Sequence, residues 1–289
     1  MSRLMERVTA SIENATVLDA PASVGQKLTA KIPPGKVKDL LSGTPIGHPL
    51  HPALVALPIG AFAGALALDA TSGDRAASRR LIGLGLCAAL PTAAAGLSDW
   101  GDTQGAERRV GLAHALGNSM GLSLLAWSWR VRGRGSSGAV SAVAGFAIMG
   151  AAGWLGGHLA YALGVGVDTT VFQQPPTDWT DACAEADLAD GEPLAVTIVD
   201  SPILLVRHAD AAHAIGDRCS HRGGPLHEGT VVNGCIQCPW HGSRFNLDDG
   251  AVERGPATRP QPLFDTRVVN GRVQVRRVEE RTLRTNPTR

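Results

Sequence analysis

Two short segments near the C-terminal end carry cysteine and histidine at the spacing of metal ligands. Residues 219–226 read CSHRGGPL and residues 238–245 read CPWHGSRF, with sixteen residues between His221 and Cys238. Each loop is rich in Gly or Pro, which lets backbone amides approach a bound sulfur closely. Two thiolates can hold one ferric iron and two neutral imidazoles a second, an arrangement with a higher reduction potential than an all-cysteine cluster.

The cysteines do not form the pattern of a disulfide framework. They are Cys87, Cys183, Cys219, Cys235 and Cys238. Their number is odd and their spacing irregular, whereas disulfide scaffolds carry an even number in a short chain. A zinc ion held by Cys235 and Cys238 with Cys219 and a histidine is the alternative to an iron–sulfur cluster. We interpret Cys87 and Cys183 as structural, and Cys235 likewise if iron is bound.

The pattern C-x-H…C-x2-H, the RGGPL tail and the CPWHGSRF box closely resemble the Rieske iron–sulfur family, over roughly residues 178–280. The resemblance implies a [2Fe–2S] cluster with Cys219 and Cys238 on one iron and with His221 and His241 on the other. It also implies that the two histidines lie at the exposed tip of the cluster, where a redox partner docks.

Neighbouring residues predict the character of the cluster. Rieske proteins of cytochrome bc complexes have a disulfide between the two loops, but the corresponding residues here are Gly224 and Trp240. Their sulfur-bonding tyrosine is Phe245 here, while Ser243, which can bond a bridging sulfide, is retained. Fewer hydrogen bonds to sulfur stabilise the reduced state less, so we expect a potential below that of the bc class, as in a Rieske ferredoxin. Pro239 and Trp240 are expected to shield the cluster.

A terminal Rieske oxygenase needs a mononuclear iron bound by two His and one carboxylate, in a large domain after the cluster domain. Here about ten residues follow the last predicted strand, and none is His. We therefore expect an electron-transfer component of an oxidoreductase system rather than a stand-alone oxygenase.

The region 42–167 is apolar and predicts an all-α bundle in a membrane. Residues 41–68, 81–98, 110–129 and 135–167 contain no Asp, Glu, Lys or Arg. About 20 such residues cross a bilayer as a helix, and the many small residues suit close packing in lipid. A soluble Ala-rich bundle is the alternative, but its helices would show a charged face. We predict four transmembrane helices, with a salt bridge between Asp69 and the nearby arginines Arg75, Arg79 and Arg80.

Four histidines of this region lie toward one membrane face, because successive spans alternate in direction. They are His48, His51, His114 and His158. Intramembrane ionisable groups are functional candidates. We expect two of them to bind a b-type haem, another metal or a quinone, and His114 with His158 is the leading pair because adjacent antiparallel spans bring them to similar depth. Helix capping and hydrogen bonds to backbone carbonyls are the alternative.

The same half also resembles a family of four-helix bacterial membrane domains of unassigned function. The segments GHPLHPALVALPIG, GLSDW and GWLGGHL carry this likeness. It implies the architecture and no chemistry.

The remaining segments complete the predicted order of domains. They are a polar N-terminal segment (1–41), the membrane domain (42–167), a linker with Pro175-Pro176 (168–181), an all-β Rieske domain (182–280) and a tail (281–289). The predicted strands are 193–199, 203–208, 211–215, 230–232, 235–237, 244–246, 262–269 and 272–278. Asn270-Gly271 predicts a hairpin between the last two strands.

Composition limits the partners and the compartment. The net charge of +1 and the lack of a basic stripe with aromatics exclude nucleic acid as a predicted partner. The first twenty residues have no apolar core of signal-peptide length. We predict a multi-pass protein of the bacterial cell membrane that transfers single electrons from a donor protein to an acceptor protein or a quinone. A redox sensor and a transporter with a regulatory Rieske cap are the alternatives.

The charges near the spans and the export signals bear on the membrane orientation. Arginines near the spans mildly favour the face opposite the Rieske domain as cytoplasmic. Against this, no twin-arginine export signal is visible, and the missing disulfide suits a reducing compartment. We expect the Rieske domain on the cytoplasmic side.

Overall fold

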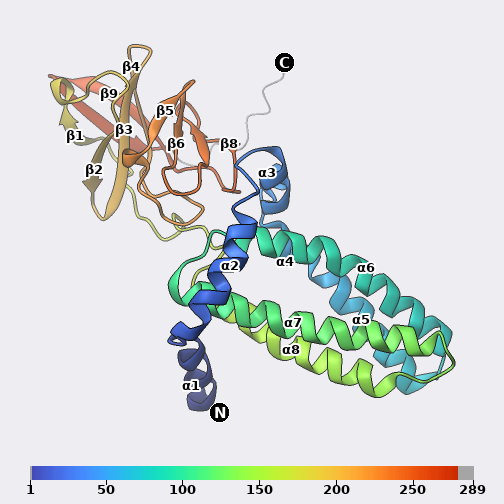
Figure 1. Cartoon of the computed structure of the whole chain (residues 1–289). Helices are drawn as coiled ribbons and strands as arrows, with labels where there is room; N and C mark the ends of the chain where they lie inside the picture. Colours follow the sequence, from blue (N-terminus) through green and yellow to red (C-terminus); the bar gives the residue numbers. More distant parts are fainter. Residues whose placement is uncertain (1, 279–289) are drawn as a thin grey trace, which may run out of the picture. The chain divides into compact units, whose positions relative to one another are not determined.

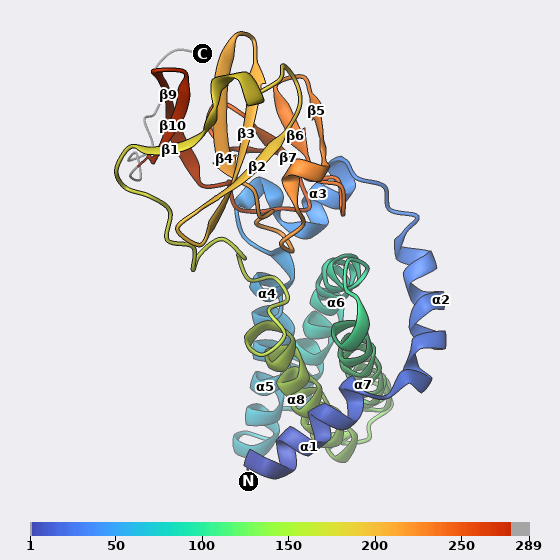
Figure 2. The ribbon, with the colours of Figure 1, turned by 90° about the vertical axis from the view of Figure 1, so that its left-hand side faces the viewer.

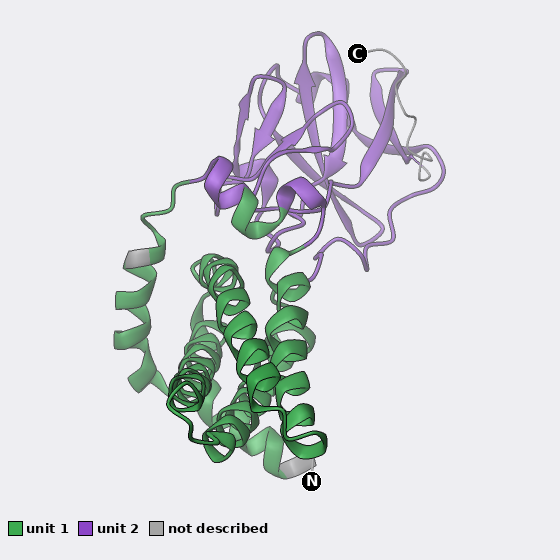
Figure 3. Cartoon of the chain, turned by 90° about the vertical axis from the view of Figure 1, so that its right-hand side faces the viewer, with its two compact units in different colours: residues 1–33, 40–43, 49–166 green, residues 34–39, 44–48, 167–289 purple. Residues whose placement is uncertain are grey.

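The computed structural model describes residues 2–278, which fall into two compact units (Figures 1 and 3). Among these residues, the first unit takes in 2–33, 40–43 and 49–166, and the second takes in 34–39, 44–48 and 167–278. The predicted tail at 281–289 lies outside the described residues.

The first unit is helical. Its helices are α1 (Ser2–Glu13), α2 (Asp19–Thr29), α4 (Leu50–Leu54), α5 (Ala56–Thr71), α6 (Arg75–Trp100), α7 (Gly105–Arg132) and α8 (Ala139–Tyr161), while α3 (Lys36–Ser42) is shared between the units. The long helices α5 to α8 run alongside one another, and α1 and α2 lie beside this bundle (Figure 2). The polar N-terminal segment is therefore largely helical. Its Asp19 carboxylate binds Arg109 of α7 through two hydrogen bonds of 2.7 and 2.9 Å.

Three helical segments among the described residues are long and apolar enough to cross a bilayer, judged by length and composition. They are Leu50–Thr71, Arg75–Trp100 and Ala139–Tyr161. The predicted count of four spans is thus not confirmed. Helix α7 has 28 residues, but Asn118 and several serines lower its hydropathy. The hydroxyls of Ser119 and Ser123 donate to carbonyls one turn back, so these polar groups are satisfied within the helix.

Small residues bring the helices of the bundle together in pairs. A Cβ on Gly121 of α7 would lie 2.7 Å from the carbonyl oxygen of Gly145 on α8, and the reverse distance is also 2.7 Å. A Cβ on Gly85 of α6 would collide with the ring of Phe62 on α5. This is the close packing that small residues permit between membrane helices. The buried hydrophobic cluster of the unit contains Phe62, Ala65, Ile82, Leu125 and Ala142.

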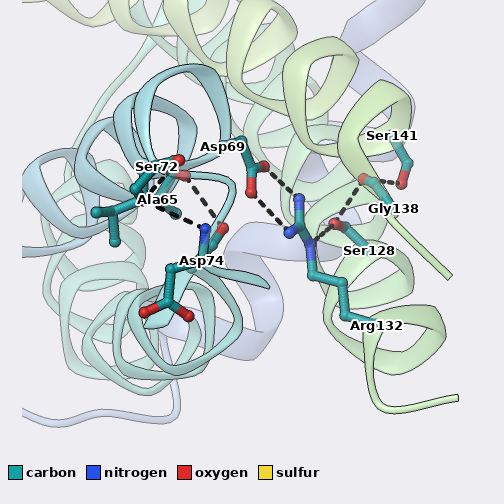
Figure 4. Close-up of polar contacts among 10 residues, drawn as sticks. Ala65, Asp69, Ser72, Asp74, Ser128, Arg132, Gly138 and Ser141 are labelled. Carbon is teal, nitrogen blue, oxygen red and sulfur yellow. Dashed lines mark hydrogen bonds and ion pairs between the residues drawn. The ribbon is translucent and has the colours of Figure 1, made fainter. Parts of the chain in front are cut away.

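A buried ion pair joins α5 to α7 (Figure 4). Arg132 donates to both carboxylate oxygens of Asp69, at 2.9 and 2.5 Å, and its side chain is 1% exposed. Ser128 accepts from Arg132 Nε at 3.0 Å and donates to the Gly138 carbonyl at 2.7 Å. The expected partner of Asp69 was wrong, because helix packing brings up an arginine 63 residues away; Arg79 instead donates to the Trp129 carbonyl at 3.1 Å.

The second unit is a β structure of two antiparallel sheets. The six-stranded sheet has the order β1 (Thr180–Ala184), β10 (Arg272–Arg277), β9 (Leu263–Val269), β4 (Ala211–Gly216), β3 (Ser201–His208) and β2 (Leu194–Ile198). The four-stranded sheet has the order β5 (Thr230–Val232), β6 (Cys235–Gln237), β7 (Arg244–Asn246) and β8 (Val252–Arg254). All eight predicted strands are present, whereas β1 and β8 were not predicted.

Turn residues and the alternating direction of side chains along the strands explain this β structure. Asn270 and Gly271 have φ values of 53° and 72°, so the predicted hairpin between β9 and β10 is confirmed. Strand β3 is buried on both faces, because Ile203 and Leu205 enter one hydrophobic cluster while Leu204 and Val206 enter another. The second of these clusters also contains Cys219 and Cys238, and so the core supports the two loops that carry them.

Candidate metal centre

Two loops with the same backbone pattern carry the predicted ligands. The first follows β4 and the second joins β6 to β7. In each loop the cysteine carbonyl accepts from the amide four residues later, at 2.8 Å for Cys219 and 3.1 Å for Cys238. The cysteine amide in turn donates to the carbonyl five residues later, at 2.9 and 2.8 Å. Gly223 and Gly242 close the two turns with φ values of 74° and 76°, a backbone that favours glycine.

Each loop also directs backbone amides at its cysteine sulfur. Cys219 accepts from the amides of His221 and Arg222, and Cys238 accepts from the amides of Trp240 and His241. Amide donors in this arrangement favour a negatively charged sulfur, which is the form that binds iron. The two cysteine side chains are 1% and 2% exposed and are hydrogen-bonded to each other, so both sulfurs face the same place.

The two thiols titrate as a pair. The hydrogen bond from Cys219, together with the two backbone amides and against the effect of burial, lowers the pKa of Cys238 to about 7. The hydrogen bond with Cys238, then burial, raises the pKa of Cys219 well above its usual value. One proton is therefore lost readily, and the second is lost when a cation such as ferric iron compensates the added charge.

The two histidines form a second pair. The rings of His221 and His241 have centroids 5.0 Å apart and an interplanar angle of 89°. Burial lowers the pKa of His221 well below its usual value, and the charges of His241, Arg222 and Lys38 act in the same direction. The neutral imidazole thus favoured is the form that binds a metal. With metal–nitrogen bonds of about 2.0–2.1 Å, two imidazoles at neighbouring positions of a tetrahedral ion have centroids about 5 Å apart.

The residues present fit a binuclear cluster better than a single ion. Among residues 2–278, no group of three or more His, Cys, Asp or Glu converges on one metal position. A thiol pair and an imidazole pair are each two ligands, which matches two irons with two protein ligands each. A Cβ on Gly224 would lie 3.0 Å from the Cys238 sulfur and 3.0 Å from the Trp240 ring, so only glycine leaves room beside the sulfur. Cys235, the ligand of the zinc alternative, instead contacts the Asn233 carbonyl.

Comparison with known proteins agrees with this arrangement. The profile of the Rieske [2Fe-2S] domain matches residues 178–273, and that of a predicted membrane protein family, DUF2231, matches residues 47–169. The anthranilate 1,2-dioxygenase ferredoxin subunit of Burkholderia cepacia is 34% identical over 98 residues, which is 34% of this chain and 91% of that protein. The chain belongs to the Rieske [2Fe–2S] family.

Two further relatives define the extent of the likeness. Ferredoxin CarAc of Metapseudomonas resinovorans is 35% identical over 34% of this chain and 92% of that protein. Apoptosis-inducing factor 3 of Homo sapiens is 34% identical over 35% of this chain, but the chain spans only 17% of its length. The Rieske domain is therefore homologous to ferredoxin components of dioxygenase systems, and it is joined to a domain of a membrane protein family.

The other residues predicted near the Rieske cluster lie on or beside the same loops. The Trp240 side chain is 53% exposed, its ring is 6.4 Å from that of His241, and the neighbouring Pro239 is also exposed. Ser243 is fully buried, and its oxygen accepts from the Ala257 amide at 3.0 Å, which leaves its own proton for a further acceptor. That proton is available to a bridging sulfide, the role expected of Ser243.

Several residues that support the Rieske loops carry no motif of their own. The buried Asp217 accepts from the amide of His227 at 2.8 Å and from its ring at 2.7 Å, which anchors the end of the first loop. Thr169 donates to the Cys219 carbonyl at 2.8 Å. Asp39 accepts from the Gly255 amide at 3.0 Å, and Thr44 donates to the Ala257 carbonyl at 2.9 Å.

These contacts show that the segments on either side of the apolar helices belong to the Rieske unit. Residues 34–39 and 44–48 precede the first apolar helix, and residues 167–170 follow the last. A Cβ on Gly255 would lie 2.2 Å from the Thr44 hydroxyl, so the fit is tight. The predicted division into a polar segment, a membrane domain and a linker gave no sign that both segments would pack against the loops.

The membrane histidines separate into different environments. The rings of His51 and His114 have centroids 6.4 Å apart, at an interplanar angle of 86°. His158, the predicted partner of His114, instead has its Nε2 2.7 Å from the Glu13 carboxylate and stacks on Trp154. The reason is helical phase. Gly156 of α8 faces the His114 ring, and a residue two positions later points about 200° away. His48 belongs to the Rieske unit.

Proposed function

We propose that this protein is a membrane-tethered one-electron carrier of the Rieske ferredoxin type. The observation that carries the proposal is the pair of matching loops, which combine a buried thiol pair with a pair of imidazoles. A [2Fe–2S] cluster held by Cys219, Cys238, His221 and His241 supplies one-electron reduction and oxidation. The chain contributes amides that stabilise negative sulfur and a hydrophobic core that excludes water.

The donor and acceptor follow from the relatives and from the fused domain. The chain covers about nine tenths of two ferredoxin relatives, one of them a subunit of a dioxygenase, which supports a soluble reductase or oxygenase-type protein as one partner. The fused domain supports a second partner within the lipid bilayer, a haem or a quinone. Thr44, which bonds to the loop at Ala257, precedes His51 by only seven residues, and this short connection supports electron transfer toward the membrane.

Spectroscopy on the full chain in detergent tests the proposal. Reduction with dithionite is expected to give the rhombic EPR signal of a reduced Rieske cluster, with about two irons per chain. Steady reduction by a ferredoxin reductase and reoxidation by a quinone in proteoliposomes distinguish a carrier from the alternative, a redox sensor. A reconstituted chain without the Rieske signal would overturn the proposal, and a cluster that changes state without sustained turnover would favour the sensor.

Orientation is part of the same proposal. We place the Rieske domain on the cytoplasmic side, since Gly224 and Trp240 stand at the positions of the inter-loop disulfide, and its absence suits a reducing compartment. Protease treatment of intact spheroplasts is expected to leave the Rieske domain uncut, and its digestion would reverse the assignment.

A further inference from the structure

A second histidine pair lies in the helical unit, on helices that are far apart in the sequence. His51 comes from α4, which leads into α5, and His114 comes from α7. Their rings are 6.4 Å apart between centroids and nearly perpendicular, at 86°. Both rings are half-buried. The bundle's hydrophobic cluster lies eleven residues further along each helix, at Phe62 and Leu125, which is about 16 Å along the axis.

Hydrogen bonds to backbone carbonyls fix the tautomer of each ring. His51 Nδ1 lies 2.8 Å from the Thr92 carbonyl oxygen of α6, and His114 Nδ1 lies 2.7 Å from the Ala152 carbonyl oxygen of α8. A carbonyl can only accept, so each Nδ1 carries the proton. In the neutral imidazole this leaves a lone pair on Nε2. Near His114 Nε2, at 3.3 Å, lies the amide nitrogen of Asn118, which also donates to the His114 carbonyl at 2.9 Å. Metal-binding histidines are held in this same way by an outer hydrogen bond.

The separation of the rings fits two ligands on opposite sides of one metal. Metal–nitrogen bonds of about 2.0–2.1 Å, with each nitrogen about 1.1–1.2 Å from its ring centroid, place two opposed imidazoles about 6.2–6.6 Å apart. The observed 6.4 Å matches this value. The pair His221 and His241, at 5.0 Å, matches neighbouring positions instead.

The number of protein ligands selects the kind of metal group. A bare zinc ion takes four ligands, and within residues 2–278 no third His, Cys, Asp or Glu joins this pair at a common metal position. A porphyrin supplies the in-plane nitrogens itself and needs protein ligands only along its axis. Two histidines on opposite sides of an iron would therefore be complete for haem, whereas two are incomplete for a bare ion.

Two glycines make room for the rings. A Cβ on Gly96 of α6 would lie 2.7 Å from His51 Cε1 and Nδ1, and a Cβ on Gly156 of α8 would lie 2.9 Å from His114 Cε1. Each ring thus rests on the backbone of the neighbouring helix, which also supplies its carbonyl acceptor. The same small-residue packing is repeated on both sides of the site.

We propose that the helical unit binds one b-type haem, with His51 and His114 as its two axial ligands. The inference rests on the proposed function only in naming the membrane acceptor; the binding site itself stands on the geometry of this unit.

The test is haem binding by the full chain in detergent, purified from cells supplied with haem precursor and then titrated with hemin. Wild-type protein is expected to bind about one haem per chain, with a low-spin ferric EPR spectrum and a reduced α band. H51A and H114A are expected to lose haem affinity by at least about tenfold or to become high-spin, and added imidazole is expected to restore the low-spin spectrum. The matched controls H48A and H158A are expected to keep both haem and spin state.

The Rieske EPR signal of each sample serves as the internal measure of folding. Wild-type protein with a full cluster signal and no haem, even after titration, would overturn the inference and leave the proposed function standing. Haem binding in a chain that never assembles a cluster would support the inference and overturn the proposed function. Low-spin haem that persists in H51A or H114A, or that is lost in H158A, would also overturn the assignment of the axial ligands.

Discussion

The two histidine pairs of this protein have nearly the same interplanar angle, 89° and 86°, but different separations, 5.0 and 6.4 Å. In the Rieske unit the rings come from two loops that each carry their own motif. In the helical unit they come from two helix hairpins and are fixed by carbonyls of neighbouring helices. The shorter distance suits neighbouring positions on one iron, and the longer one suits the opposite positions that we propose for haem, so the two pairs differ in the metal geometry that each would serve.

Removing a cysteine ligand should abolish one centre and spare the other. C219S is expected to lose essentially all cluster iron and the Rieske EPR signal, because a serine oxygen replaces the thiolate that accepts from the His221 and Arg222 amides. Haem content should stay unchanged. Iron and sulfide analysis measures the loss, and C235S is the control, since Cys235 is also buried but contacts the Asn233 carbonyl. A full cluster in C219S would contradict the ligand assignment.

The ion pair between Asp69 and Arg132 tests whether the helical unit and the Rieske unit unfold independently. R132A is expected to destabilise the helical unit by about 1–3 kcal/mol, because it leaves the half-buried Asp69 carboxylate without its partner. Thermal unfolding followed by far-UV circular dichroism measures this loss, while visible absorption follows the cluster. The exposed Arg134 provides the control variant R134A. Equal melting temperatures of R132A and R134A would show that the ion pair adds no stability.

The glycine beside the His114 ring tests the haem geometry without touching a ligand. G156A places a Cβ 2.9 Å from His114 Cε1 and should reduce haem content several-fold, by roughly 3- to 10-fold, as loss of outer-shell support commonly does. G153A is the matched control on the same helix, because a Cβ there meets nothing within 4 Å. Haem per chain, normalised to the cluster signal, is the measurement. Identical haem content in the two variants would count against the site.

The smallest expected effect concerns the potential of the Rieske cluster. Phe245 is fully buried in the same hydrophobic cluster as both ligand cysteines, and F245Y places a hydroxyl at the position of the sulfur-bonding tyrosine of the bc class. One added hydrogen bond of about 1 kcal/mol corresponds to a rise of about 40 mV for a one-electron couple. Potentiometric titration monitored by EPR measures it, with F264Y in the other hydrophobic cluster as control. A wild-type potential already in the bc range would contradict the ferredoxin-like assignment.

The extent of successful prediction differs between the two units for a physical reason. Short strands, the Asn270-Gly271 turn and both ligand loops are encoded by neighbouring residues, and all of them are found in the structure. Strand β8 was missed because its three residues, 252–254, contain two charged side chains and become a strand only by pairing with β7. The predicted span in α7 is not confirmed, since the prediction counted freedom from charge and left out the polar weight of Asn118 and the serines.

The amino-acid sequence by itself determined the chemistry available to this protein. It specified a cysteine and a histidine on each of two glycine-bearing loops, a run of apolar segments, and a set of histidines toward one end of them. Only the tertiary structure decided which groups meet: Asp69 with Arg132, His51 with His114, His158 with Glu13, and juxtamembrane residues with the cluster loops. The physical reason is that helix phase and packing set these long-range contacts, whereas a ligand loop needs only local turns and a few backbone hydrogen bonds.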